Sequence, residues 1–295
     1  MNILLSFDSG YFLPALVLLR SLLLNNRWCG RITVYVLYLN LTDGELRRFS
    51  AAAEEFGNGS AVFIRVPEDA FADAPLNLGW ITRETYFRLL AQELLPETVE
   101  RFLYLDVDTV VCGSLEEFYN QDFEGNLLVA CASPRAFRPD ARTMQQLTLP
   151  ADTVYFNAGV LLHDLKAQRQ EIDPAVYREY PVLFYNQLKF NDQDVLNAVF
   201  YGMTKIADFR RYYLFDSYLH TPADVEWALQ NTRIFHFNGM GKPWMQAYWG
   251  LMSGLFWKYA VAIPEYAARQ EELMSKHGAF RARYEREREE KRVEG

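Results

Sequence analysis

The first half of the chain alternates short apolar runs with longer stretches in which apolar residues recur every three or four positions. The first pattern predicts buried strands and the second predicts amphipathic helices. The expected strands cover 2–7, 31–39, 61–66 and 102–105, and the expected helices between them cover 13–25, 45–56 and 83–95. This order is typical of an α/β protein with a doubly wound, mostly parallel sheet flanked by helices. Ligands of such sheets bind beyond the carboxyl ends of the strands.

The second half of the chain is less regular. Further strands are expected over 127–132, 154–162 and 233–237, and a helix over 192–200. After residue 245, closely spaced aromatic residues predict a helical region, and Arg, Glu and Lys dominate from residue 281 onward. We therefore expect one domain over 1–245 and a helical C-terminal extension with a charged tail over 246–295.

Two carboxylates follow the strand expected at 102–105. Asp106 and Asp108 are two positions apart, so in an extended chain both point to the same side. Carboxylates that close repel each other unless a proton or a cation lies between them. A divalent cation with oxygen ligands would meet that need. Because Asp-x-Asp is a short and common pattern that could simply end a strand and cap a turn, the interpretation requires further ligands.

His236 is the best third ligand among the four histidines. It opens the segment His-Phe-Asn-Gly-Met-Gly-Lys-Pro-Trp, in which Gly239 and Gly241 would let the backbone approach a ligand. Lys242 adds a charge suited to phosphate. An imidazole beside two carboxylates suits Mn²⁺ better than Ca²⁺. The alternative is a plain glycine turn before a helix that starts at Pro-Trp.

Two polar insertions are candidates for binding a polar ligand. Asn157-Ala-Gly159 interrupts an apolar strand, so a ligand could approach the backbone there, or the asparagine could occupy a bulge. Asp192-Gln193-Asp194 stands at a helix start, where acids commonly cap, but the same residues could point into a cleft. The residues alone leave both alternatives open.

Composition narrows the classes of function. The chain of 295 residues is 50% hydrophobic, enough for a substantial core, and its net charge of −8 argues against nucleic acid and against a strongly basic membrane patch. The glycine motifs of dinucleotide and P-loop sites are absent from the sequence. Three cysteines without CxxC spacing indicate a reducing compartment. With no basic leader before the first strand, we expect a cytoplasmic protein.

Five motifs together resemble glycosyltransferase family 8, which includes bacterial lipopolysaccharide galactosyl- and glucosyltransferases. They cover about residues 1–250 in order: Asp8 with Tyr11, Thr85-Tyr-Phe-Arg88 after Leu76-Asn77, Phe-Leu-Tyr-Leu-Asp106-Val-Asp108, Tyr-Phe-Asn157-Ala-Gly-Val-Leu-Leu with Asn-Asp192-Gln-Asp-Val-Leu-Asn, and the His236 segment. The resemblance implies a GT-A fold and retaining transfer of galactose or glucose from a UDP-sugar to a glycan or glycolipid acceptor. It also implies Mn²⁺, with Mg²⁺ as the alternative ion, and a role in lipopolysaccharide biosynthesis. We expect the protein to make at most weak peripheral contact with the inner face of the membrane.

The resemblance also implies site residues in three groups. The metal ligands would be Asp106, Asp108 and His236. Donor contacts would come from Asp8 and Tyr11 at the uracil, Gly239 and Lys242 at the diphosphate, Arg88, Asn157 and Ala158 around the sugar, and Thr85, Asp106 and Val107. The candidate catalytic residues are Gln193 and Asp192. Retention usually points to a carboxylate nucleophile, and because the corresponding residue is the amide Gln193, we favour attack by the acceptor on the front face of the sugar.

Two departures from the family pattern bear on the donor. Gly10 stands where bacterial relatives often carry Asn, so a ribose contact is expected to be missing. Ala132-Ser133 lacks the acid that galactosyltransferase relatives place near the sugar. The choice between galactose and glucose therefore stays open.

Two other functions compete with this interpretation. Asp106-Val-Asp108-Thr-Val also fits the first motif of haloacid-dehalogenase-like phosphatases, in which the first aspartate is phosphorylated. Those enzymes usually carry the motif on their first strand, whereas several β-α units precede it here. The other alternative is a UDP-sugar-binding protein that has lost transfer activity.

Overall fold

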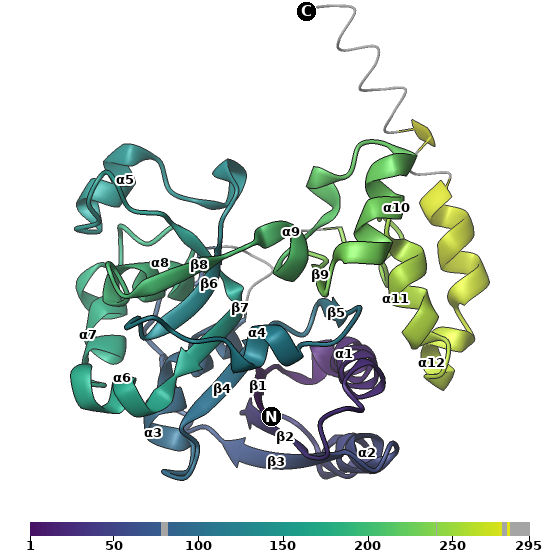
Figure 1. The fold of residues 1–295 in the computed structure, drawn as a ribbon, viewed down its shortest axis with the longest axis horizontal. Coiled ribbons are helices and arrows are strands. Elements are labelled where there is room, and N and C mark those ends of the chain that lie inside the picture. Colours follow the sequence, from purple (N-terminus) through teal and green to yellow (C-terminus); the bar gives the residue numbers. More distant parts are fainter. Residues whose placement is uncertain (78–81, 240, 279–281, 284–295) are drawn as a thin grey trace, which may run out of the picture.

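The computed structural model describes residues 1–77, 82–239, 241–278 and 282–283. Its centre is a seven-stranded sheet in the order β3-β2-β1-β4-β7-β6-β8 (Figure 1). The strands are β1 (Asn2–Ser6), β2 (Ile32–Tyr38), β3 (Gly59–Arg65), β4 (Arg101–Leu105), β6 (Leu128–Ala132), β7 (Phe156–Asp164) and β8 (Thr204–Ala207). A separate two-stranded ribbon pairs β5 (Thr109–Val111) with β9 (Ile234–His236).

The sheet is mostly parallel, as predicted. β3, β2, β1 and β4 run parallel, and β8 runs parallel to β6. β7 runs antiparallel to both of its neighbours, β4 and β6. The short strands β5 and β8 were not predicted, because runs of three or four residues carry little periodicity.

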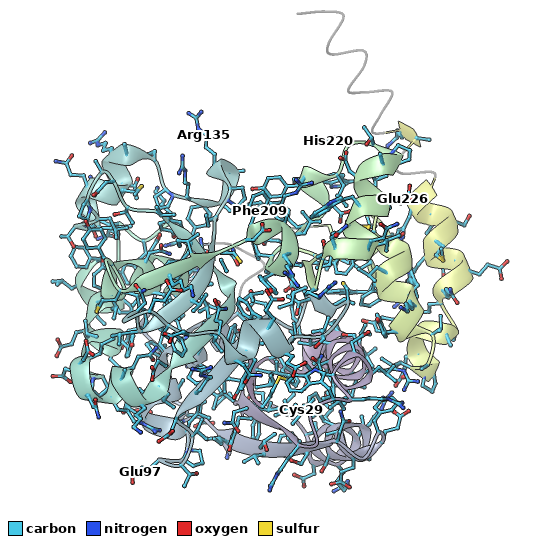
Figure 2. The ribbon with its side chains drawn as sticks, in the orientation of Figure 1. Cys29, Glu97, Arg135, Phe209, His220 and Glu226 are labelled. Atoms are coloured by element: carbon cyan, nitrogen blue, oxygen red, sulfur yellow. The ribbon has the colours of Figure 1, made fainter. Side chains whose placement is uncertain are left out.

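Helices cover both faces of the sheet and bury its central strands on both sides. In β1, Ile3 and Leu5 belong to one hydrophobic cluster and Leu4 to the other. The first cluster includes residues of α1 (Phe12–Asn25), α2 (Asp43–Glu54), α4 (Glu116–Asn120) and α9 (Phe209–Tyr212). The second includes residues of α3 (Ala91–Leu94), α6 (Leu165–Glu171), α7 (Val176–Leu183) and α8 (Asp192–Val199), with α5 (Ala141–Gln146) packed beside it. Figure 2 shows side chains filling the space between these layers, with Glu97 and Arg135 at the periphery.

The helix predicted over 83–95 is divided in the structure. A 3₁₀ helix, η2 (Arg83–Leu90), precedes α3, and the Thr82 side chain makes no capping hydrogen bond. In a 3₁₀ helix, side chains at i and i+3 lie directly above one another. That geometry stacks Arg88 over Thr85, whose carbonyl accepts a 2.9 Å hydrogen bond from Arg88 Nε. The other 3₁₀ turns are η1 (Ser9–Tyr11), η3 (Arg135–Phe137) and η4 (Asp216–Tyr218).

The aromatic C-terminal region packs on the domain as predicted. α11 (Ser253–Ala260) lies beside α1 in Figure 1, and its Trp257 and Tyr259 are buried. α10 (Pro222–Asn231) precedes this region in the chain, and α12 (Pro264–Ala267) follows α11. Asn25 of α1 donates a 2.8 Å hydrogen bond to the Tyr259 hydroxyl. Among the described residues, no helix is both long and apolar enough to cross a bilayer. Apart from 282–283, the predicted charged tail lies outside the described residues, and the boundary at 245 stays a prediction.

Candidate active site

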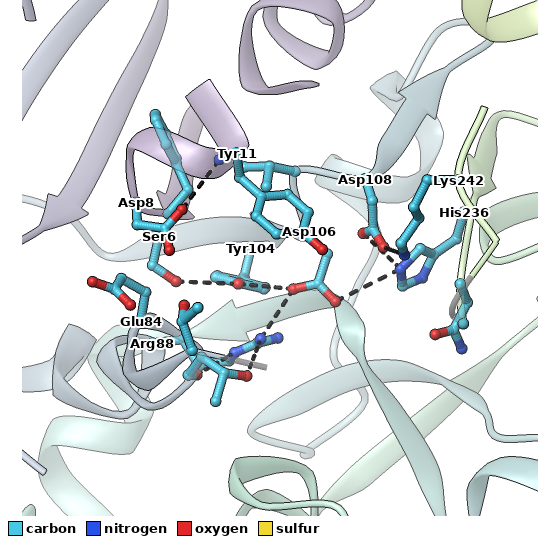
Figure 3. Close-up of a pocket in the computed structure, with 16 residues that line it drawn as sticks. Ser6, Asp8, Tyr11, Glu84, Arg88, Tyr104, Asp106, Asp108, His236 and Lys242 are labelled. Atoms are coloured by element: carbon cyan, nitrogen blue, oxygen red, sulfur yellow. Dashed lines mark hydrogen bonds and ion pairs between the residues drawn. The ribbon is translucent and has the colours of Figure 1, made fainter. Parts of the chain in front are cut away.

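Three potential metal ligands meet where β4 ends. Asp106 follows β4 directly, and Asp108 immediately precedes β5. Because β5 pairs with β9 with Thr109 opposite His236, the ribbon places the imidazole beside both acids. His236 Nε2 lies 2.9 Å from Asp108 Oδ1 and 3.7 Å from Asp106 Oδ2 (Figure 3). One ligand atom from each residue lies within 4.8 Å of the others, as the sequence predicts for a metal site.

The surroundings of these residues fit a divalent cation. Two carboxylates and one imidazole match the preferences of Mn²⁺. Gly159 of β7 provides the room: a Cβ at this position would lie 2.6 Å from Asp106 Oδ2 and 2.4 Å from His236 Cε1. The second ring nitrogen of His236, Nδ1, is buried and has no hydrogen-bond partner among the residues that the structure describes.

The ammonium of Lys242 contacts Asp108 in the structure. It forms an ion pair with Asp108 Oδ2 and donates a 2.7 Å hydrogen bond to the Phe237 carbonyl. Burial alone would raise the pKa of Asp108, but the imidazole of His236 and the ammonium of Lys242 hold that pKa below its usual range. Asp108 therefore remains ionised at neutral pH, in the form that a metal requires.

Asp8 and Tyr11 form the opposite end of the same cavity. Asp8 Oδ1 accepts a 3.1 Å hydrogen bond from the Tyr11 backbone amide, which fixes the turn that starts α1. Burial, and then the charges of Asp108, Asp106 and Asp8, raise the pKa of the Tyr11 phenol. The phenol thus stays protonated, and its ring meets Trp244 edge to face at 6.2 Å.

Arg88 links the metal ligands to a second cavity. Its guanidinium lies 3.0 Å from Asp106 Oδ1 and 3.0 Å from Asp192 Oδ2, and it donates to the Ala158 carbonyl. Its carbon Cζ lies 4.1 Å from the centre of the Tyr104 ring. Burial would lower the pKa of Arg88, but Asp106 and Asp192 raise it, so the side chain remains a cation.

Asp192 and Gln193 start α8 and face this second cavity. Burial raises the pKa of Asp192 to about 6, although Arg88 and the 2.7 Å hydrogen bond from Thr85 Oγ1 oppose that shift. Gln193 Oε1 accepts hydrogen bonds of 2.9 Å from Asn157 Nδ2 and 3.1 Å from the Ala158 amide. Neither side chain caps the helix; instead, Asn191 precedes it with a φ of 52°.

Every predicted site residue lines one of these two adjoining cavities. The first is lined by Asp8, Tyr11, Thr85, Arg88, Asp106, Val107, Asp108, His236, Gly239 and Lys242. The second is lined by Asn157, Ala158, Asp192 and Gln193, together with Thr85, Arg88, Asp106 and Gly239, which are common to both.

Sequence reasoning missed other lining residues, notably Tyr104, Glu84 and Asn238. Tyr104 donates a 2.9 Å hydrogen bond to Asp106 Oδ1. It stands on β4 two positions before Asp106, so the alternation of side chains along a strand could have identified it. Glu84 and Asn238 carry no comparable local signal.

Comparisons with known proteins decide the family. The model of glycosyl transferase family 8 matches residues 2–247. The chain belongs to glycosyltransferase family 8. A lipopolysaccharide 1,2-glucosyltransferase of Escherichia coli K12 is 28% identical over 255 residues, which are 83% of this chain and 72% of that protein. A lipopolysaccharide 1,3-galactosyltransferase of Salmonella typhimurium LT2 is 26% identical over 268 residues, which are 84% of this chain and 74% of that protein.

A solved structure supports the same assignment for this family 8 chain. The crystal structure of the galactosyltransferase LgtC with donor and acceptor sugar analogues superimposes with a TM-score of 0.78 at 26% identity. The match covers 91% of this chain and 100% of that one. The predicted GT-A fold and glycosyltransferase activity are thereby confirmed. The phosphatase alternative is not favoured, because the family match and the structural match both point to glycosyltransferases.

Proposed function

We propose that this chain is a retaining, Mn²⁺-dependent hexosyltransferase that moves galactose or glucose from a UDP-sugar to a glycan or glycolipid acceptor in lipopolysaccharide biosynthesis. The observation that carries the proposal is the convergence of Asp106, Asp108 and His236 beside a second cavity lined by polar side chains. The names of the bacterial relatives support a hexose donor and a lipopolysaccharide-type acceptor. Since those names include both a glucosyl- and a galactosyltransferase, the donor hexose is left to experiment.

The first cavity would hold the nucleotide. Asp108, Asp106 and His236 would ligate the divalent cation, which would offset negative charge on the diphosphate as it departs. Lys242, which pairs with Asp108 in the structure, would contact the same phosphates. Asp8 and Tyr11, at the other end of the cavity, would contact the uracil.

The second cavity would hold the hexose. Asp192, Arg88 and Asn157 offer acceptors and donors for sugar hydroxyls, and the charged ones would bind them most strongly. The carbonyl of Gln193 would face positive charge that develops at the anomeric carbon. In front-face attack, the bond from that carbon to the UDP oxygen breaks while the bond to the acceptor oxygen forms. The acceptor proton passes to the departing diphosphate.

We also propose that the enzyme works in the cytoplasm at the inner face of the membrane, with at most weak peripheral contact. Two observations support this placement. The C-terminal aromatic residues Trp257, Tyr259 and Tyr266 are buried in the domain, so they cannot anchor it at a lipid interface. Lipopolysaccharide relatives imply an acceptor that carries lipid.

A donor screen tests the proposal. The protein is incubated with Mn²⁺ and a panel of UDP-sugars, with and without acceptor sugars, and UDP release is measured. We expect turnover of UDP-glucose or UDP-galactose, lost with EDTA and reduced by orders of magnitude in Asp108→Asn, which removes one ligand charge. Asp69→Asn changes an exposed aspartate away from the cavities and is the matched control. Tight UDP-sugar binding without any turnover would instead identify a binding protein.

A further inference from the structure

The side-chain amide of Gln193 is bonded on both of its ends. Its oxygen accepts from Asn157 and from the Ala158 backbone amide, and its nitrogen Nε2 donates to the Phe137 carbonyl at 3.0 Å and to the Tyr155 hydroxyl at 3.3 Å. A backbone N–H can only donate and a backbone carbonyl can only accept. The Ala158 amide and the Phe137 carbonyl therefore fix the orientation of the Gln193 amide, with its oxygen toward β7.

A buried tyrosine and a buried carboxylate lie behind that amide. The Tyr155 hydroxyl donates a 2.5 Å hydrogen bond to Asp194 Oδ1. Asp194 Oδ2 accepts from the backbone amides of Lys189 at 2.6 Å and Phe190 at 2.8 Å. An ionised carboxylate can only accept, so the hydroxyl hydrogen points to Asp194 and an oxygen lone pair is left for Gln193.

Neither residue of this pair belongs to the lining of the two cavities. Tyr155 is 1% exposed and Asp194 0% exposed, and among the described residues both are absent from the cavity walls. Burial raises the pKa of the Tyr155 phenol well above its usual value, which keeps the donating hydrogen in place. Both oxygens of Asp194 are occupied by hydrogen bonds, so this carboxylate is not presented to a sugar.

We propose that Tyr155 and Asp194 are positioning residues that hold the Gln193 amide in the orientation that transfer requires. Asp194 orients the Tyr155 hydroxyl, and the hydroxyl in turn accepts from Gln193 Nε2. The Gln193 carbonyl is then held toward β7 at the wall of the sugar cavity. This inference rests on the proposed function, in which that carbonyl stabilises the reacting sugar.

A double-mutant cycle tests the coupling between Tyr155 and Gln193. Tyr155→Phe removes only the hydroxyl, so kcat should fall about tenfold to a hundredfold, the range expected when a buried polar partner is lost. The KM for the UDP-sugar should stay within about threefold, because no donor contact is removed. In a Gln193→Ala background, the same Tyr155→Phe change should leave kcat unaltered. Tyr180→Phe is the matched control, since the buried Tyr180 hydroxyl donates a 2.6 Å hydrogen bond to Leu147, away from the amide.

A second variant and a readout independent of turnover complete the test. Asp194→Asn would turn a side-chain N–H toward the Tyr155 oxygen, so it should lower kcat as Tyr155→Phe does. NMR should show the Gln193 side-chain amide hydrogens exchanging with solvent faster in both variants than in the parent protein. Unchanged kcat and exchange in Tyr155→Phe, or an equal loss of kcat with and without Gln193, would overturn the positioning role. If the parent protein turns over no UDP-sugar, the proposed function is refuted instead. In that case, slower exchange of the Gln193 amide hydrogens in the parent than in the two variants would still support the positioning role of Tyr155 and Asp194.

Discussion

Replacing Gly159 by alanine should weaken metal binding strongly while leaving the fold intact. The added methyl would lie 2.4 Å from His236 Cε1 and 2.6 Å from Asp106 Oδ2, where ordinary contacts begin at 3.4 Å. To restore such contacts, the imidazole would have to withdraw by 1.0 Å and the carboxylate by 0.8 Å (3.4 Å minus each distance). Metal–ligand distances deviate from their typical values by only about 0.2 Å. Two of the three ligands would therefore leave their positions.

The magnitude follows from that displacement. Disturbing even the groups that support a ligand costs about 10–100-fold in metal affinity, so we expect Gly159→Ala to lose at least a hundredfold. The overpacking itself should lower the free energy of unfolding by about 1–3 kcal/mol. Since the φ of Gly159 lies outside the left-handed region, alanine adds no backbone strain there.

Mn²⁺ titrations followed by electron paramagnetic resonance, with and without UDP, measure this effect, and thermal unfolding checks the fold. Gly254→Ala is the control, because a Cβ at Gly254 in α11 would meet nothing within 4 Å. It should leave Mn²⁺ affinity unchanged. A Gly159→Ala protein that binds Mn²⁺ as tightly as its parent would refute the assignment of Asp106 and His236 as ligands.

Further predictions concern three charged side chains. Lys242→Met removes a cation beside Asp108, so it should tighten Mn²⁺ binding in the absence of UDP and weaken UDP binding. Calorimetry measures both affinities, and weaker Mn²⁺ binding in the variant would contradict this prediction. Arg88→Lys cannot reach Asp106 and Asp192 together, so kcat/KM should fall at least tenfold; near-normal kinetics would show that this bridge is dispensable. Turnover should rise with pH through about 6 as Asp192 ionises, and this limb should vanish in Asp192→Asn. The pKa of Asp192 in the folded protein is higher than its ordinary value of about 3.9 in an unfolded chain. The contribution of Asp192 to the free energy of unfolding should therefore fall as the pH rises from about 4 to about 6. Denaturant titrations at several pH values should show that slope in the parent and not in Asp192→Asn.

Local patterns in the sequence predicted every strand of the large sheet except β8, and they predicted the metal trio. The structure confirms that Asp106 and Asp108 meet with His236. The reason differs from the predicted alternation of an extended chain, because Asp106 to Thr109 form a turn in which the Thr109 amide donates a 3.1 Å hydrogen bond to the Asp106 carbonyl. The direction of β7 was not accessible in the same way. Apolar periodicity marks a strand without telling whether its neighbours run parallel or antiparallel.

The side-chain partners could not be predicted, because they depend on contacts between distant segments. Lys242 and Asp108 are separated by 134 positions, and Arg88 reaches the Ala158 carbonyl across 70. The sequence suggested phosphate for Lys242, while the structure shows it paired with a metal ligand. Such pairings arise from the tertiary packing of β9 against β5 and of η2 against β7.

Time-resolved NMR of UDP-glucose and UDP-galactose turnover tests the central claim most directly. Both donors carry the hexose in the α configuration, and acceptor-free turnover with Mn²⁺ releases the sugar to water. The account predicts that the α-hexose appears first, before mutarotation, and that EDTA abolishes its appearance. Early appearance of the β-hexose, or equal rates with and without EDTA, would contradict a retaining, metal-dependent transferase.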